Sequence, residues 1–220
     1  MLKVGTRPSP LAVIQTREAI DFLYRSGIDA EMDVVLIASD GDLDKTTPFA
    51  NIEGSDFFTR QLEEALRRGE IDIAVHSAKD LEDAPPMDLT TAVLTPSLSP
   101  HECLVVRKAA TLRTLPVGSI LGTSSQKRAE AIRRFRPDLR IKDIRGTIQE
   151  RVAQLDSGDY DALIMAHAAL IRLGLEQRIA EIIPPEIIPP HPLQGRLALQ
   201  VRSSDEKLIR LLSPLATVQT

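Results

Sequence analysis

Two regularities in the 220-residue sequence predict an α/β protein built from two lobes. Short apolar runs of strand length alternate with amphipathic helical patterns, which is typical of mainly parallel α/β sheets. Two proline-rich stretches, 95–102 and 182–195, interrupt this alternation, because proline cannot extend a helix or a central strand. If the chain crosses between lobes at both stretches, residues 1–95 and 196–220 form domain 1 and residues 96–195 form domain 2. A cleft between the lobes is then the expected binding site.

The individual elements follow from apolar runs and helical periodicity. The runs that predict strands span residues 2–5, 33–39, 71–75, 89–94, 102–106, 119–122, 139–144, 160–166 and 197–201. The patterns that predict helices span residues 9–27, 56–69, 124–135, 147–158, 166–174 and 204–213. Glycine stands where a left-handed cap would end four of these helices, at Gly27, Gly69, Gly158 and Gly174.

The composition argues against several classes of protein. Aromatic residues make up 3% of the chain, so few side chains could stack on bases. The net charge of −4 does not favour binding to phosphates. No apolar run approaches the roughly 18 residues that span a bilayer, and the N-terminus shows no basic-then-apolar leader. We therefore expect a cytoplasmic protein that binds neither nucleic acid nor membrane. A single cysteine and four dispersed histidines predict no metal site.

Positive charge is concentrated in the middle of the chain. Residues 107–151 contain twelve Lys or Arg and four acids, a local charge of +8, so the remainder of the chain carries −12. Such a block is either a solvated helix face or a site for an anion.

The loop GTRPSP (5–10) follows the first predicted strand and leads into a helix. Ser9 fits an N-cap with Pro10 at the first helical position. Thr6 and Arg7 lie where, in an α/β sheet, strand ends and helix N-termini face a ligand. The alternative is that Ser9 is only a cap and that Arg7 is only solvated.

The loop GTSSQKR (122–128) repeats this geometry in the second lobe. Thr123 and Ser125 supply hydroxyl groups at a helix start, and Lys127 and Arg128 lie in its first turn. Basic residues there oppose the positive end of the helix dipole. A bound anion therefore explains them better than helix stabilisation does.

A third strand-to-helix segment, IRGTIQER (144–151), carries Arg145 on the loop and Arg151 one turn into the helix, and Arg172 is a further candidate. The planar fork of arginine forms two parallel hydrogen bonds to a carboxylate. Several such forks in one lobe predict a ligand with several carboxylates or phosphates.

The strand-like run IDIAV is followed directly by HSAKD, which ends on Lys79 and Asp80. The two could form a surface ion pair worth at most about 1 kcal/mol. Adjacent residues in a loop rarely pair well, so each is better assigned a separate partner. Lys79 would hold an anion, and Asp80 would hold or protonate a group that becomes cationic.

These motifs, taken in this order, resemble the porphobilinogen deaminase (hydroxymethylbilane synthase) family. The resemblance covers nearly the whole chain. It is carried by KVGTRPSPLAVIQ, DFFTRQLEEALRRGEIDIAVHSAKD, SPHECLVV, GTSSQKR, RPDLRIKDIRGTIQERVAQLDSGDYDALIMA, IRLGL and PLQGRLALQVRSSD. It implies two type II periplasmic-binding-protein-like lobes and the condensation of four porphobilinogen molecules, with loss of ammonia, in tetrapyrrole biosynthesis.

The resemblance also implies roles for individual residues. The catalytic aspartate of the family falls on Asp80, and Phe58 matches an aromatic residue that lies by the cofactor. The carboxylate-binding set falls on Arg7, Ser9, Lys79, Thr123, Ser125, Lys127, Arg128, Arg145, Arg151 and Arg172. Thr6, Ser55 and Gln194 complete the expected cleft, with Ser55 standing where the family has a lysine.

The family assembles its product on a dipyrromethane cofactor, which is attached to a cysteine in a third, α+β domain. This chain stops at residue 220, where that domain would begin, so we expect the domain and its attachment cysteine to be absent. Cys103 is expected to be a buried structural thiol.

The sequence therefore predicts a transferase that acts on porphobilinogen and linear pyrrole chains. We expect a monomer, and a separate partner that supplies a third domain is not identified. The alternative is a protein without turnover, whose cationic cleft binds a tetrapyrrole precursor or another polycarboxylate.

Overall fold

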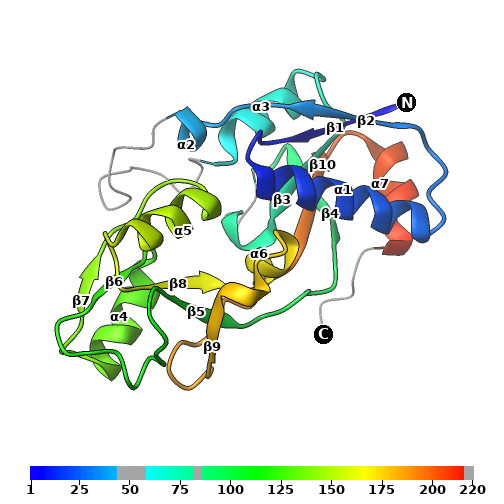
Figure 1. Ribbon diagram of the computed structural model, residues 1–220. Coiled ribbons are helices and arrows are strands. Elements are labelled where there is room, and N and C mark those ends of the chain that lie inside the picture. Colours follow the sequence, from blue (N-terminus) through cyan, green and yellow to red (C-terminus); the bar gives the residue numbers. More distant parts are fainter. Residues whose placement is uncertain (44–57, 82–85, 216–220) are drawn as a thin grey trace. The chain divides into compact units, whose positions relative to one another are not determined.

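The computed structural model of the chain describes residues 1–43, 58–81 and 86–215 (Figure 1). The chain divides into two compact units. Unit 1 contains the described residues up to Leu98 and those from Arg196 onward, and unit 2 contains Ser99–Gly195.

Among its described residues, unit 1 contains a sheet of strand order β2-β1-β3-β10-β4. Its strands are β1 (Leu2–Thr6), β2 (Met32–Leu36), β3 (Ile73–Ser77), β4 (Leu89–Leu94) and β10 (Leu197–Arg202). Its helices are α1 (Pro10–Arg25), α2 (Asp40–Leu43), α3 (Arg60–Arg67) and α7 (Glu206–Leu212), with 3₁₀ turns η2 (Ala78–Asp80) and η4 (Ser213–Leu215). β1 is parallel to β2 and β3, whereas β10 is antiparallel to β3 and β4.

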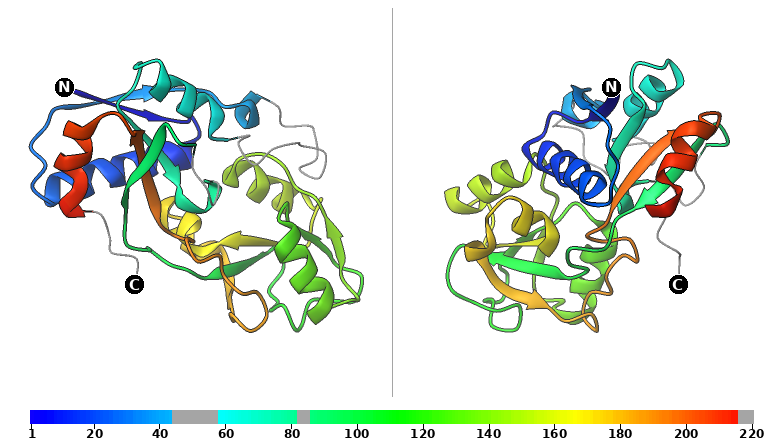
Figure 2. Two further views of the ribbon diagram at one scale, coloured as in Figure 1. Left: turned by 180° about the vertical axis from the view of Figure 1, so that it is seen from behind. Right: turned by 90° about the vertical axis from the view of Figure 1, so that its right-hand side faces the viewer.

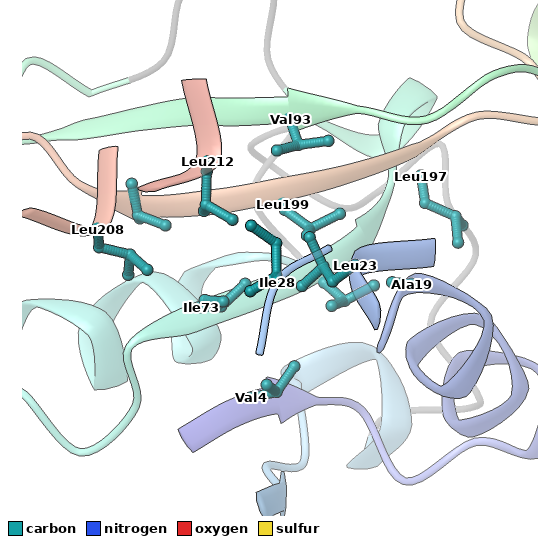
Figure 3. Packing of buried hydrophobic residues seen from close by; sticks show 12 residues of the cluster. Val4, Ala19, Leu23, Ile28, Ile73, Val93, Leu197, Leu199, Leu208 and Leu212 are labelled. Carbon is teal, nitrogen blue, oxygen red and sulfur yellow. The ribbon is translucent and has the colours of Figure 1, made fainter. Parts of the chain in front are cut away.

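Helices cover both faces of this sheet because successive strand residues point to opposite sides. On one face, Ile73 and Leu199 pack with Leu23 of α1 and Leu208 of α7 (Figure 3). On the other face, Ala74 packs with residues of α3, which lies across the sheet from α1 (Figure 2). The carboxyl end of β3 is therefore supported from both sides.

Among its described residues, unit 2 contains a sheet of order β7-β6-β8-β5-β9. Its strands are β5 (Glu102–Val106), β6 (Ile120–Gly122), β7 (Arg140–Lys142), β8 (Ala162–Ala166) and β9 (Ile179–Ile183). Its helices are α4 (Gln126–Phe135), α5 (Ile148–Ser157) and α6 (His167–Arg172), with the 3₁₀ turn η3 (Glu176–Arg178). β6 is parallel to β7 and β8, and β5 is antiparallel to β8 and β9.

Unit 2 has an apolar core on each face of its sheet. Ile132 of α4 packs on one face with Leu104 and Ile164, and Leu155 of α5 packs on the other with Leu163. The close fit at Gly122 follows from this packing, since an added Cβ would lie 2.6 Å from Leu163 Cδ2 and 2.8 Å from Tyr160 Cδ1.

The predicted α/β class in two lobes is confirmed, but the sheets are mixed rather than mainly parallel. The alternation of strands and helices predicted parallel pairing. In the structure β10 is antiparallel to β3, and β5 is antiparallel to β8. β9 was not predicted, because its sequence IAEII runs into the proline-rich stretch. The left-handed conformation is confirmed at the four predicted glycines, with φ between +64° and +95°.

Candidate functional site

The carboxyl ends of β1 and β3 lie side by side in unit 1, because the two strands are neighbours and parallel. The loop after β1 carries Arg7 and Ser9, and the η2 turn after β3 carries Lys79 and Asp80. Gln15 links α1 to the end of β3, since its Nε2 donates to Ser77 Oγ at 2.9 Å. Arg7, Ser9, Lys79 and Asp80 thus follow the carboxyl ends of neighbouring strands, as the general rule for α/β folds leads us to expect.

The Arg7 guanidinium pairs with the carboxylate of Asp42, which the sequence analysis did not single out. Arg7 Nε donates to Asp42 Oδ2 at 3.0 Å, and Nη2 donates to Oδ1 at 2.6 Å. Burial alone would raise the pKa of Asp42, but hydrogen bonds from Arg7 and Ser39 outweigh it and lower that pKa. The Arg7 guanidinium also lies 4.4 Å from the centroid of the Phe58 ring. Arg7 is therefore held in place and is not simply solvated.

Thr6 and Ser9 have clear local roles. Ser9 is the N-cap of α1, where its Oγ accepts a hydrogen bond from Ala12 N at 3.3 Å, as predicted from the sequence. The buried Thr6 hydroxyl donates to Ala12 O at 3.2 Å. Both side chains fix the start of α1 and so the path of the loop that carries Arg7.

Asp80 is partly exposed and ends the η2 turn. Within the described part of the chain, no hydrogen bond or ion pair occupies its carboxylate. This contrasts with Asp42 of α2, whose two carboxylate oxygens both accept hydrogen bonds. The Asp80 carboxylate is thus available for a ligand.

In unit 2 the loop after β6 carries Thr123 and Ser125 into α4. Ser125 is the N-cap, and its Oγ accepts from Arg128 N at 3.4 Å. Lys127 is exposed in the first turn of α4. Arg128 instead forms a side-on pair with Glu102 of β5, with Nε to Oε1 at 2.9 Å and Nη2 to Oε2 at 2.7 Å. Sequence reasoning missed Glu102, although an acid at the start of an otherwise apolar strand was a signal.

The adjacent loop, between β7 and α5, carries Arg145, and Arg151 lies in the first turn of α5. Arg151 Nε donates to Gly146 O at 2.9 Å, and Gln154 Nε2 donates to Arg145 O at 3.0 Å. Tyr160 anchors the same loop because its hydroxyl donates to Asp143 O at 2.6 Å. These contacts fix the path of the loop and the side chain of Arg151. Because β6 and β7 are parallel neighbours, this loop follows the strand next to the one that leads into α4.

The charges of Arg128 and Arg145 both act on Arg151. Burial, followed by the charges of Arg128 and Arg145, lowers the pKa of Arg151 to about 10. Asp143 and Tyr160 act in the opposite direction but do not restore its usual value. Like charges repel, so an anion bound among these groups would relieve a cost that the chain itself only partly offsets.

The remaining candidates belong to other segments or lie outside the described residues. Arg172 Nη2 donates to Gly195 O at 2.9 Å. Gln194 is buried, and its Nε2 donates to Pro100 O and to His101 O, each at 3.1 Å. Ser55 lies outside the described residues.

Cys103 is fully buried in β5. Its Sγ donates to Met165 O at 3.4 Å. Burial, aided by the charge of Glu102, raises the pKa of the thiol to about 12, which leaves almost no reactive thiolate.

Within the described residues, no cluster of three or more His, Cys, Asp or Glu side chains could hold a metal ion. In the same part of the chain, no helix is both long enough and apolar enough to cross a membrane.

Comparison with known proteins identifies the family. The family model described as "Porphobilinogen deaminase, dipyromethane cofactor binding domain" matches residues 2–210. Proteins named porphobilinogen deaminase from Roseiflexus castenholzii and from a second Roseiflexus strain are 40% and 41% identical to it over 214 residues. In both cases the match covers 97% of this chain and 71% of the relative.

The chain belongs to the porphobilinogen deaminase family.

Solved structures show how this family's fold relates to others. The methionine-binding protein MetQ is similar with a TM-score of 0.58 at 12% identity, over 97% of this chain and 89% of that one. A nutrient-binding protein from Burkholderia cenocepacia bound to methionine gives a TM-score of 0.55 at 13% identity, over 96% and 90% of the chains. These likenesses show the fold alone, which is that of two type II periplasmic-binding-protein-like lobes.

The basic residues Lys127, Arg128, Arg145 and Arg151 of unit 2 are called the cation cluster here. Their charges fit the dipyrromethane cofactor that the porphobilinogen deaminase family implies. The resemblance implies a cofactor that carries carboxylates, and burial together with the charges of Arg128 and Arg145 lowers the pKa of Arg151. Arg145, Arg151 and Lys127 are the residues that would hold such a group, with the Ser125 end of α4 beside them.

Proposed function

We propose that this member of the porphobilinogen deaminase family condenses porphobilinogen molecules with release of ammonia, as a hydroxymethylbilane synthase does. The observation that carries the proposal is the set of three arginines Arg128, Arg145 and Arg151, which lie in the first turn of α4, on the loop after β7 and in the first turn of α5. The names of the relatives support a transferase of tetrapyrrole biosynthesis.

In this proposal the cluster binds the carboxylates of the substrate. By the resemblance, each porphobilinogen carries an acetate and a propionate, so a growing chain gains two negative charges with each unit. Guanidiniums on neighbouring loops offer paired N–H donors to such groups, in a place where water screens charge less than in bulk solvent. The dipyrromethane cofactor, when bound, supplies the pyrrole end to which the first substrate is joined.

Asp80 supplies the second half of the chemistry. In each condensation the C–N bond of the aminomethyl group breaks, and the protonated amine leaves as ammonia. A bond then forms between the methylene carbon and the free α carbon of the next pyrrole, which gives up its proton. The Asp80 carboxylate stabilises the cationic azafulvene that remains after the amine departs, and it can accept the released proton.

The test follows porphobilinogen consumption and uroporphyrin I formation by the purified chain and by Asp80→Asn. We expect the substitution to lower the rate by about 100-fold to 10,000-fold, the range for removal of a general acid or base. Asp33→Asn is the control, because Asp33 is an exposed acid of the same unit. It should leave the rate unchanged.

Two results would contradict this function. Unchanged turnover in Asp80→Asn would remove Asp80 from the chemistry. Saturable porphobilinogen binding without consumption would favour a binding protein instead.

A further inference from the structure

Glu102 and Arg128 form an ion pair that is unusually well shielded for two charged residues. Their side chains are 5% and 13% exposed. Glu102 is the first residue of β5 and Arg128 lies in the first turn of α4, so the pair connects a strand to the helix that begins at the cation cluster. Both oxygens of the carboxylate are used, which fixes the plane of the guanidinium.

The carboxylate occupies only one edge of the guanidinium. Arg128 Nε and Nη2 face Glu102, whereas Nη1 makes no hydrogen bond to any of the described residues. A guanidinium has five N–H donors, so a second carboxylate can bind the edge formed by Nη1 and the remaining N–H of Nη2. The pair therefore leaves Arg128 able to bind a ligand.

The same arrangement occurs in unit 1. Asp42 occupies the Nε and Nη2 edge of Arg7, and Asp42 is in turn fixed by Ser39, whose N and Oγ donate at 2.9 and 2.7 Å. Arg7, on the loop between β1 and α1, and Arg128, in the first turn of α4, are thus oriented by one internal carboxylate each. Because the same pairing occurs in both units, a role in ligand binding explains it better than packing alone does.

We propose that Glu102 is a positioning residue, which holds the Arg128 guanidinium side-on so that its outer edge faces a ligand carboxylate. Stability alone explains the pair poorly, because removing two charges from water costs about as much as their attraction returns. Orientation explains it better, since a pre-oriented guanidinium loses less freedom when the ligand binds. This inference rests on the proposed function and adds a residue to it.

The test measures porphobilinogen binding to the full chain by titration calorimetry, together with the thermal unfolding midpoint of each protein. We expect Glu102→Gln to weaken binding by about 10-fold to 100-fold, the range for residues that orient a binding group. In Arg128→Gln, adding Glu102→Gln should cause no further loss, because Glu102 acts only through Arg128.

Asp138→Asn is the matched control. Asp138 pairs with Arg136 in the same side-on manner, with Nε to Oδ1 at 2.7 Å and Nη2 to Oδ2 at 2.6 Å, and neither residue belongs to the candidate site. It should lower the unfolding midpoint without changing the affinity. Glu102→Asp keeps the charge and should recover part of the affinity, and it takes the place of Glu102→Gln if that variant does not fold.

The outcomes separate this inference from the function on which it rests. Unchanged affinity with a lowered unfolding midpoint in Glu102→Gln means a structural pair and overturns the inference. Tighter binding overturns it too, since Glu102 would then compete with the ligand. In both cases the proposed function survives, whereas absence of saturable binding to the unsubstituted chain defeats both.

Discussion

Burial favours the neutral form of both His76 and Cys103, although one side chain is a base and the other an acid. Both side chains are kept neutral, with the pKa of His76 lowered to about 4 and that of Cys103 raised to about 12, chiefly by burial. His76 Nε2 lies 3.1 Å from Gln200 Oε1, and Gln200 Nε2 donates to Glu63 Oε1 at 3.1 Å. Because Gln200 offers an acceptor there, we assign the proton of His76 to Nε2.

His76 should make the protein less stable in acid. Its folded-state pKa lies below the usual 6.5, so its contribution to the free energy of unfolding is complete above pH 6.5 and is lost as the pH falls towards 4. The loss amounts to about 3 kcal/mol. In His76→Gln, urea unfolding between pH 7 and 4.5 should show a clearly smaller decrease. Identical pH profiles for the two proteins would mean that His76 is not held neutral.

At the scale of elements, the start of α5 positions two of the clustered arginines. Thr147 and Glu150 form a capping box, in which Thr147 Oγ1 accepts from Glu150 N at 3.3 Å and Glu150 Oε2 accepts from Thr147 N at 2.7 Å. Gly146 has a φ of +100°, and an added Cβ there would lie 2.8 Å from Glu150 Oε2. The loop can therefore close on the helix only with glycine at this position.

Thr147→Ala should lower the free energy of unfolding by about 1 kcal/mol, since it leaves a helix N–H without its cap. Thr147→Ser keeps the hydroxyl and should behave like the unsubstituted protein. Urea unfolding at pH 7 measures both. If the serine variant were as unstable as the alanine variant, the methyl group rather than the cap would be the important feature.

At the scale of the molecule, the two units differ in how the chain builds them. Among the described residues, unit 2 is made from one continuous stretch, Ser99–Gly195, with apolar cores on both faces of its sheet. Unit 1 needs β10, which enters its sheet between β3 and β4 from the far end of the sequence. Leu197, Leu199 and Val201 of that strand are all buried in its core.

The fragment 99–195 should therefore unfold cooperatively by itself, because its core is contained within it. The fragment 1–95 should not, because it lacks β10 and so leaves β3 and β4 without their shared partner. Thermal unfolding followed by circular dichroism distinguishes them. A cooperative transition in fragment 1–95 would show that β10 is dispensable.

Much of the fold could be predicted because apolar periodicity reports burial directly. The run IDIAV predicts β3 for this reason, and Ser9 and Pro10 predict the start of α1. β9 escaped prediction because a five-residue strand beside prolines resembles a loop in sequence. The antiparallel direction of β10 was not predicted either. An apolar run indicates a strand but not whether that strand runs parallel or antiparallel to its neighbours.

The sequence by itself determined the α/β class, the family, and which loops carry the cations and Asp80, because these depend on residue type and short-range spacing. Only the tertiary structure decided that Arg7 and Arg128 are each held by an internal carboxylate, 35 and 26 residues away in the chain. Local patterns cannot show such pairs, because the partners meet only when helices and strands pack around a shared core.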